Sequence, residues 1–147
     1  MDGANTRIVK RWFEEVWNQR KRATISELFA ASGVAHGVSD TGGDLHGPAE
    51  FLPFYDRLVA AFPDIRVVVD DCIEAGDKVA VRYSATMSHG GEYFGLQASG
   101  RSATVTGISL LRVANGQLVE SWDAWDKLTL MHQIGGVRFA PEITQVK

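Results

Sequence analysis

The sequence is poor in cysteine, in net charge and in long apolar runs, and each shortage excludes a class of protein. Its 147 residues include one cysteine, Cys72, which excludes an internal disulfide and a multi-cysteine metal site. The formal net charge of −3 gives no electrostatic reason to expect nucleic acid or an anionic membrane as a partner. No apolar run is long enough to span a membrane, and Met1–Asn5 lack the basic start of a secretory signal. We expect one domain over residues 1–147 in a cytoplasmic protein.

The histidines do not have the spacing of a metal site. His36 and His46 flank a glycine-rich segment, His89 ends an expected strand, and His132 falls in the last expected helix. No pair has the i, i+4 spacing of a helical zinc site. We therefore expect no metal.

Apolar residues recur at helical spacing in the first part of the chain. The pattern predicts helices over Thr6–Trp17, from Thr24 onwards, and from Gly47–Pro48 to Phe62. Thr24 and Glu27 have the spacing of a capping box, and Gly33 ends the second helix.

The segment His36–Gly47 holds four glycines and is typical of a loop. It is longer than most connectors, which favours a functional loop at a pocket mouth.

After Phe62–Pro63 the period changes to the alternation of strands. Strands are expected from Ile65, over Val79–Ser88 and over Ala103–Val113. Asn115–Gly116 then predicts a tight hairpin into a last strand, and a short helix follows near Leu128–Ile134. Helices followed by a strand meander predict an α+β fold, with N-terminal helices packed on a strongly curved, mixed or antiparallel sheet that encloses a conical cavity.

Asp123 is the most informative residue of the last strand. It shares one face with Val119, Ser121 and Trp125, while Trp122 lies on the other face. A carboxylate on a covered face is unfavourable unless it is paired or used. Two interpretations stay open: a buried Asp satisfied by backbone donors, and a general base with a raised pKa in a pocket.

Five segments together resemble the SnoaL-like polyketide cyclase family of the nuclear transport factor 2-like superfamily. They are Trp12–Asn18, Gly47–Pro48 with Phe51, Ala61–Asp64, Gly76–Arg82 and Asn115–Asp123. The resemblance runs from about Thr6 to Gly136 and implies a cone-shaped α+β barrel. It is less specific for the reaction, because this superfamily carries enzymes, binding proteins and scaffolds on one architecture.

The resemblance also implies a chemistry. In the family's cyclases, the Asp that matches Asp123 is the general acid/base of an intramolecular aldol closure that needs no cofactor. Those cyclases pair this Asp with a His on the preceding strand, and here Ser109 is the polar side chain in reach. The alternatives are a non-catalytic small-molecule-binding domain and a ketosteroid-isomerase-like isomerase that uses Asp123 with Tyr83 or Tyr55.

These arguments define the expected site and partners. We expect a hydrophobic, carbonyl-containing small molecule as substrate, and a homodimer, because the last strand has apolar residues on both faces. The expected catalytic residues are Asp123, His36 and His89, and the expected substrate-binding residues are Trp12, Tyr55, Tyr83, Ser109 and Trp125.

Overall fold

The structure is a computed structural model, and it describes residues 1–140. Its helical elements are α1 (Ala4–Trp12), the π-helical segment η1 (Phe13–Asn18), α2 (Arg22–Leu28), α3 (Gly47–Ala61) and α4 (Lys127–Gln133). Its strands are β1 (Phe29–His36), β2 (Leu45–His46), β3 (Arg66–Ala75), β4 (Lys78–Ser88), β5 (Ser102–Ala114) and β6 (Gln117–Trp125).

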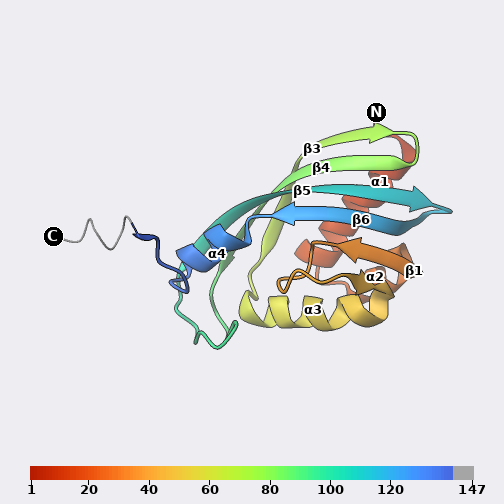
Figure 1. The fold of residues 1–147 in the computed structure, drawn as a ribbon. Coiled ribbons are helices and arrows are strands. Elements are labelled where there is room, and N and C mark those ends of the chain that lie inside the picture. Colours follow the sequence, from red (N-terminus) through yellow and green to blue (C-terminus); the bar gives the residue numbers. More distant parts are fainter. Residues whose placement is uncertain (141–147) are drawn as a thin grey trace.

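The strands form one mixed, curved sheet. Their order is β2-β1-β6-β5-β4-β3, so the sheet is open, with β2 and β3 at its edges. β1 runs parallel to β6, and the other neighbours pair antiparallel. Helices α1, α2 and α3 gather on one side of the strands (Figure 1). The predicted α+β class, with helices packed on a curved mixed sheet, is confirmed.

The helices pack on the sheet through the apolar faces that the sequence predicts. In α1, Val9 and Trp12 are buried, and in α3 the buried side chains include Phe51 and Leu58. Pro48 stands at the start of α3, where a missing backbone N–H disturbs nothing. The inward side chains of β4 and β5 complete the core, because burial alternates along both strands.

The strand β1 is absent from the sequence-based expectation, which has a helix end and a loop over this stretch. Val34 pairs with Glu120 and His36 pairs with Trp122, in parallel register. Both partners lie far away in the sequence, so this strand is stabilised by tertiary pairing rather than by a local pattern.

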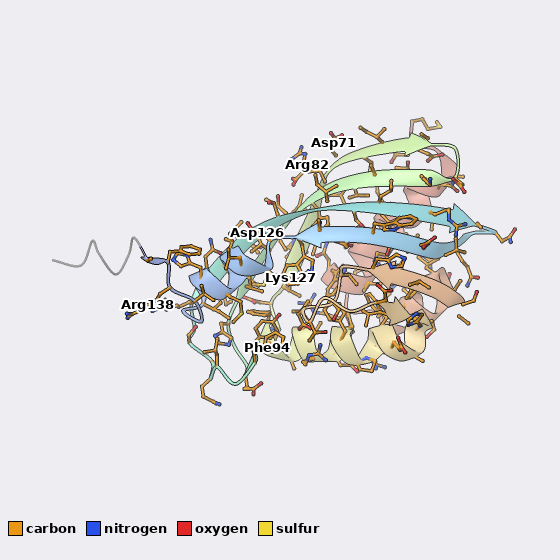
Figure 2. All side chains as sticks on the ribbon, in the orientation of Figure 1. Asp71, Arg82, Phe94, Asp126, Lys127 and Arg138 are labelled. Atoms are coloured by element: carbon orange, nitrogen blue, oxygen red, sulfur yellow. The ribbon has the colours of Figure 1, made fainter. Side chains whose placement is uncertain are left out.

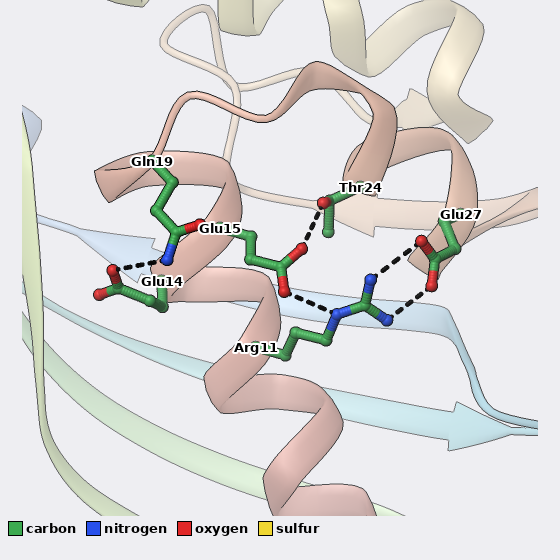
Figure 3. A network of polar contacts seen from close by, with 6 residues as sticks. All are labelled: Arg11, Glu14, Glu15, Gln19, Thr24 and Glu27. Atoms are coloured by element: carbon green, nitrogen blue, oxygen red, sulfur yellow. Dashed lines mark hydrogen bonds and ion pairs between the residues drawn. The ribbon is translucent and has the colours of Figure 1, made fainter.

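The expected capping box at Thr24 and Glu27 is also wrong. The residue before α2 is Lys21, and no side chain caps this helix. Instead, the Thr24 hydroxyl donates to Glu15 at 2.7 Å, and the Arg11 guanidinium donates to both oxygens of Glu27 at 2.6 and 2.9 Å (Figure 3). Arg11 also donates to Glu15 at 2.8 Å. These side chains tie α2 to α1 and η1.

No helix within residues 1–140 is both long enough and apolar enough to cross a membrane.

Candidate functional site

A cavity lies between the helices and the inner face of the sheet. Its wall is largely aromatic and aliphatic, and includes Trp12, Phe13, Trp17, Phe29, Phe51 and Phe54. Four polar side chains come to it from the sheet: Tyr83, Ser109, Ser121 and Asp123. Glu120 also borders the cavity, but its carboxylate binds partners on the outer side of the sheet. An apolar cavity with a few convergent polar groups is typical of a small-molecule site.

Asp123 is held by two neutral donors. The Tyr83 hydroxyl donates to Oδ1 at 2.6 Å, and the Ser109 hydroxyl donates to Oδ2 at 2.8 Å. The sheet register explains the arrangement, because Ser109 pairs directly with Asp123 across β5 and β6. Tyr83 reaches the carboxylate from the next strand, β4, where it pairs with Gly107.

The surroundings of Asp123 favour its protonated form. Burial raises the pKa of Asp123, while the hydrogen bonds from Tyr83 and Ser109 and the charge of Lys127 oppose that rise. Burial and the neighbouring Asp123 charge also raise the pKa of Tyr83, so its phenol stays protonated and remains a donor. The arrangement pairs a proton acceptor with donors that do not lose their own protons near neutral pH.

The loop after β1 is fixed against the end of β6. The Trp125 indole N–H donates to the carbonyl of Val38 at 2.8 Å, and both residues line the cavity. Lys127 lies at the start of α4 (Figure 2). It donates to the carbonyl of Gly37 at 2.9 Å, and its ammonium lies 5.2 Å from the centre of the Trp125 ring. Gly37 has φ of +79°, and a Cβ there would lie 2.2 Å from the carbonyl oxygen of Asp123. The loop therefore closes on the strand that carries Asp123.

His36 lies on the other side of the sheet from this cavity. Ala35 lines the cavity, and the next side chain along a strand points the opposite way. The His36 ring stacks on Trp122, with Nδ1 2.9 Å from Asp44 and Nε2 2.8 Å from Glu120. Strand parity therefore places His36 away from the cavity wall, which the sequence pattern does not indicate because it does not predict β1.

His89 and Tyr55 are core residues that do not line the cavity. His89 is fully buried after β4, where its Nδ1 accepts from the backbone N–H of Ser99 at 3.2 Å and its ring packs on Phe62. The Tyr55 hydroxyl donates to the carbonyl of Val16 at 2.8 Å, which joins α3 to η1. Of the residues expected at the site, the cavity brings together Asp123, Trp12, Tyr83, Ser109 and Trp125.

Three further residues belong to the site although the sequence does not lead us to expect them there. Ser121 lines the cavity and shares the strand face of Asp123, so parity is the signal that identifies it. Gly107 lies beneath Tyr83, and its signal in the sequence is a glycine inside a strand. No pattern in the sequence indicates Lys127, because the position of its side chain depends on the direction of α4 relative to the end of β6.

Within residues 1–140, no group of three or more His, Cys, Asp or Glu side chains is arranged to hold a metal ion.

The chain is similar to several solved structures. IdmH from Streptomyces antibioticus, described as a candidate polyketide cyclase, is 30% identical; the match covers 89% of this chain and 98% of that one, with a TM-score of 0.78. A candidate SnoaL-like polyketide cyclase from Jannaschia sp. CCS1 is 26% identical, with 92% and 94% covered and a TM-score of 0.81. A protein of ketosteroid-isomerase-like fold from Catenulispora acidiphila, in complex with trimethylamine, is 20% identical, with 87% and 92% covered and a TM-score of 0.70, which shows the fold alone.

No curated protein matches the sequence. The profile of the SnoaL-like polyketide cyclases matches residues 7–134, which include every strand and every residue of the cavity wall. The chain belongs to the SnoaL-like polyketide cyclase family.

Proposed function

We propose that this protein is a cofactor-independent enzyme in which Asp123 is the general base toward a hydrophobic, carbonyl-containing small molecule. The observation that carries the proposal is the position of Asp123. Its carboxylate lies on the wall of an apolar cavity, and its direct hydrogen-bond partners there are neutral hydroxyl groups. A buried carboxylate with a raised pKa takes up a proton more readily than an exposed one.

The chemistry follows from the lone pairs of the carboxylate. Each oxygen of Asp123 accepts one hydrogen bond, and a carboxylate oxygen has a second lone-pair site. That site takes a proton from the carbon next to a substrate carbonyl, and the C–H electrons form an enolate. In a cyclisation, the enolate carbon bonds to a second carbonyl carbon of the same molecule. The new alkoxide then takes the proton from Asp123, which regenerates the base.

The cavity wall suits a neutral, apolar substrate. Trp12 and Trp125 offer flat apolar surfaces, and the hydroxyl of Ser121 faces the same space. No lysine, arginine or histidine lines the cavity within residues 1–140, so a substrate carboxylate or phosphate would find no cationic partner there. If the reaction stops at reprotonation of the enolate on another carbon, the same groups support an isomerisation, with Tyr83 rather than Tyr55 as the tyrosine next to the base.

Two observations favour the competing function, a non-catalytic small-molecule-binding domain. Both oxygens of Asp123 are already hydrogen-bonded, as expected for a buried Asp with a structural role. The partner His that the family resemblance implies is also missing from β5, where Ser109 is the polar side chain in reach of Asp123. The two functions differ in one measurable property, which is whether Asp123 moves a proton of a bound molecule.

A proton-exchange experiment tests the proposal directly. The probe is 2-tetralone, a neutral bicyclic ketone, and NMR follows the exchange of its α-protons in D2O. The protein should accelerate this exchange, and Asp123→Asn should abolish the acceleration while the probe still quenches the fluorescence of the cavity tryptophans. Binding without acceleration by the unmodified protein, for 2-tetralone and for an open-chain aromatic β-diketone, would favour the binding domain instead.

We also propose that the protein assembles as a homodimer through the outer face of its sheet. Val68, Ile108 and Trp122 are exposed on this face, at 54%, 58% and 39% of their surfaces. A second copy would cover these side chains symmetrically. The cytoplasmic location stays a prediction from the sequence.

A further inference from the structure

The cavity face of β5 has a gap at one position. Val105 and Ser109 point into the cavity, and Gly107, on the same buried face of the strand, presents no side chain between them. Gly107 pairs with Tyr83 of β4 on one side and with Trp125 of β6 on the other. The gap therefore lies in the middle of the polar wall that carries Asp123.

The phenol of Tyr83 fills this gap. A Cβ on Gly107 would lie 2.5 Å from both Cζ and Oη of Tyr83, and 2.8 Å from Cε2. Phe13 of η1 packs on the same ring, with centroids 5.3 Å apart. The phenol is thus confined between the helix and the bare backbone of β5, and its hydroxyl ends 2.6 Å from Asp123.

Backbone conformation does not require a glycine here. Gly107 is not among the glycines with positive φ, so an alanine could adopt its dihedral angles without strain. Glycine inside a strand weakens that strand and often marks a place where another group approaches closely. The approaching group here is the Tyr83 phenol, so space rather than conformation explains the residue.

We propose that Gly107 is a positioning residue. Because it has no side chain, the phenol of Tyr83 has room to cross β5 and reach Asp123. The residue at position 107 therefore determines whether the carboxylate has one hydroxyl donor or two. Its importance for catalysis rests on the proposed function of Asp123. A larger residue would push the phenol off the carboxylate and leave Ser109 as the remaining side-chain donor. The charged form of Asp123 would then be less stabilised, and the carboxylate would hold its proton more tightly.

The test is a titration of Asp123 without substrate. Carbon-13 NMR of protein labelled at the aspartate carboxyl carbons gives the pKa of Asp123, assigned by its loss in Asp123→Asn. Gly107→Ala should raise this pKa above that of the unmodified protein, and Tyr83→Phe should raise it too. In the double variant the two shifts should not add, because both remove the same hydrogen bond. Thr106→Ala, one position away on the outer face, should leave the pKa unchanged.

A second variant guards against loss of folding. If Gly107→Ala does not fold, adding Tyr83→Leu to this variant removes the ring atoms that crowd the new methyl group and should restore the fold. The pKa of Asp123 should still be raised above that of the unmodified protein. An unchanged pKa in Gly107→Ala, or a shift fully additive to that of Tyr83→Phe, would overturn the inference, as would an unchanged pKa in Tyr83→Phe. The titration is independent of turnover, so an inactive protein that still shows these shifts would refute the proposed function and leave the positioning role standing.

Discussion

Two carboxylates on the same strand, Asp123 and Glu120, have opposite surroundings. Asp123 faces the cavity and accepts from two hydroxyl groups, whereas Glu120 binds His36 at 2.8 Å and Arg112 at 3.3 Å on the outer side. Burial raises the pKa of Asp123. Hydrogen bonds from His36, and then from Arg112, lower the pKa of Glu120. The same chemical group is thus made easier to protonate on one face and harder on the other.

The difference bears on the proposed role of Asp123 as a general base. A fixed cation beside Asp123 would lower its pKa and weaken it as a base at neutral pH. The nearby ammonium of Lys127 is instead bonded to the carbonyl of Gly37 and lies over the ring of Trp125. Neutral donors hold the carboxylate in place without abolishing its affinity for a proton. On the outer face, Glu120 instead has His36 and Arg112 as direct partners.

The largest expected effect comes from exchanging one carboxylate for its amide. Asp123→Asn should lower the rate of 2-tetralone proton exchange by about 10²–10⁴-fold, the usual contribution of a general base. Glu120→Gln, on the same strand, should leave that rate unchanged, since its side chain bonds to outer-face partners. An equal loss in both variants would show that the effect comes from disturbing β6 rather than from proton transfer.

The same substitution has a consequence for stability. Because the folded state raises the pKa of Asp123, this group stabilises the fold below its ordinary pKa of 3.8, and that contribution is lost as the pH rises through the folded-state value. Asp123→Asn should therefore unfold at a temperature no lower than the unmodified protein at neutral pH. A large fall in melting temperature at neutral pH would favour the structural interpretation of Asp123.

A smaller effect is expected from removing one donor. Ser109→Ala deletes the hydrogen bond to Oδ2 of Asp123 and should raise the pKa of that carboxyl, with a loss of about 10-fold in exchange rate near neutral pH. Raising the pH should recover part of the rate, because the base becomes ionised again. The matched control is Ser84→Ala, whose hydroxyl donates to Asp70 on an exposed part of the sheet at 2.5 Å. A loss that is independent of pH would contradict the assigned role of Ser109.

The next prediction concerns the apolar side chains of the outer face. Ile108→Lys places a charge at the centre of the proposed dimer surface and should convert the dimer to a monomer in light scattering. Phe94→Lys is the control, since Phe94 is exposed in the loop between β4 and β5, away from that face (Figure 2). A monomeric unmodified protein at micromolar concentration would refute the homodimer.

Strand parity explains how much of this site could be predicted from sequence. The alternation after Asn115–Gly116 places Asp123 and Trp125 on one face, and Ser109 follows from the antiparallel hairpin. Tyr83 follows in the same way from the alternation of β4. Each of these predictions needs only the alternation of side chains along a strand and the turns that join the strands.

The sequence is least informative where a long-range contact decides the position of a side chain. The structure places His36 outside the cavity, because β1 pairs with β6 in parallel register, which no local pattern indicates. The structure places Tyr55 in the core rather than on the cavity wall, and the sequence does not separate the two positions, because an apolar helix face points inward in both cases. The burial of His89 depends on the loop that carries Ser99 folding back on it. In each case the residue type is informative, but its partner is set by the tertiary fold.

The smallest expected effect comes from breaking the contact between His36 and Glu120 on the outer face of the sheet. Hydrogen bonds to Glu120, and then to Asp44, raise the pKa of His36 above its ordinary value of 6.5. The stability that this histidine contributes is fully present below the unfolded pKa and is lost as the pH rises through the folded-state value. His36→Gln should therefore lower the melting temperature more below about pH 6 than above about pH 8. The side chain is 31% exposed, so solvent and salt screen the pair and the difference should be small.

A double-mutant cycle separates the pair from other effects of the substitution. In a Glu120→Gln background, the pH dependence of the His36→Gln effect should shrink to what the Asp44 contact supplies at 2.9 Å. Added salt should shrink it further, whereas the Asp123 titration, which takes place in a buried site, should respond less. If His36→Gln instead changed the exchange rate of 2-tetralone while leaving stability unaffected at every pH, the outer face would not be separate from the chemistry. In that case the outer face would be coupled to the cavity through Trp122, on which His36 stacks with ring centroids 5.6 Å apart.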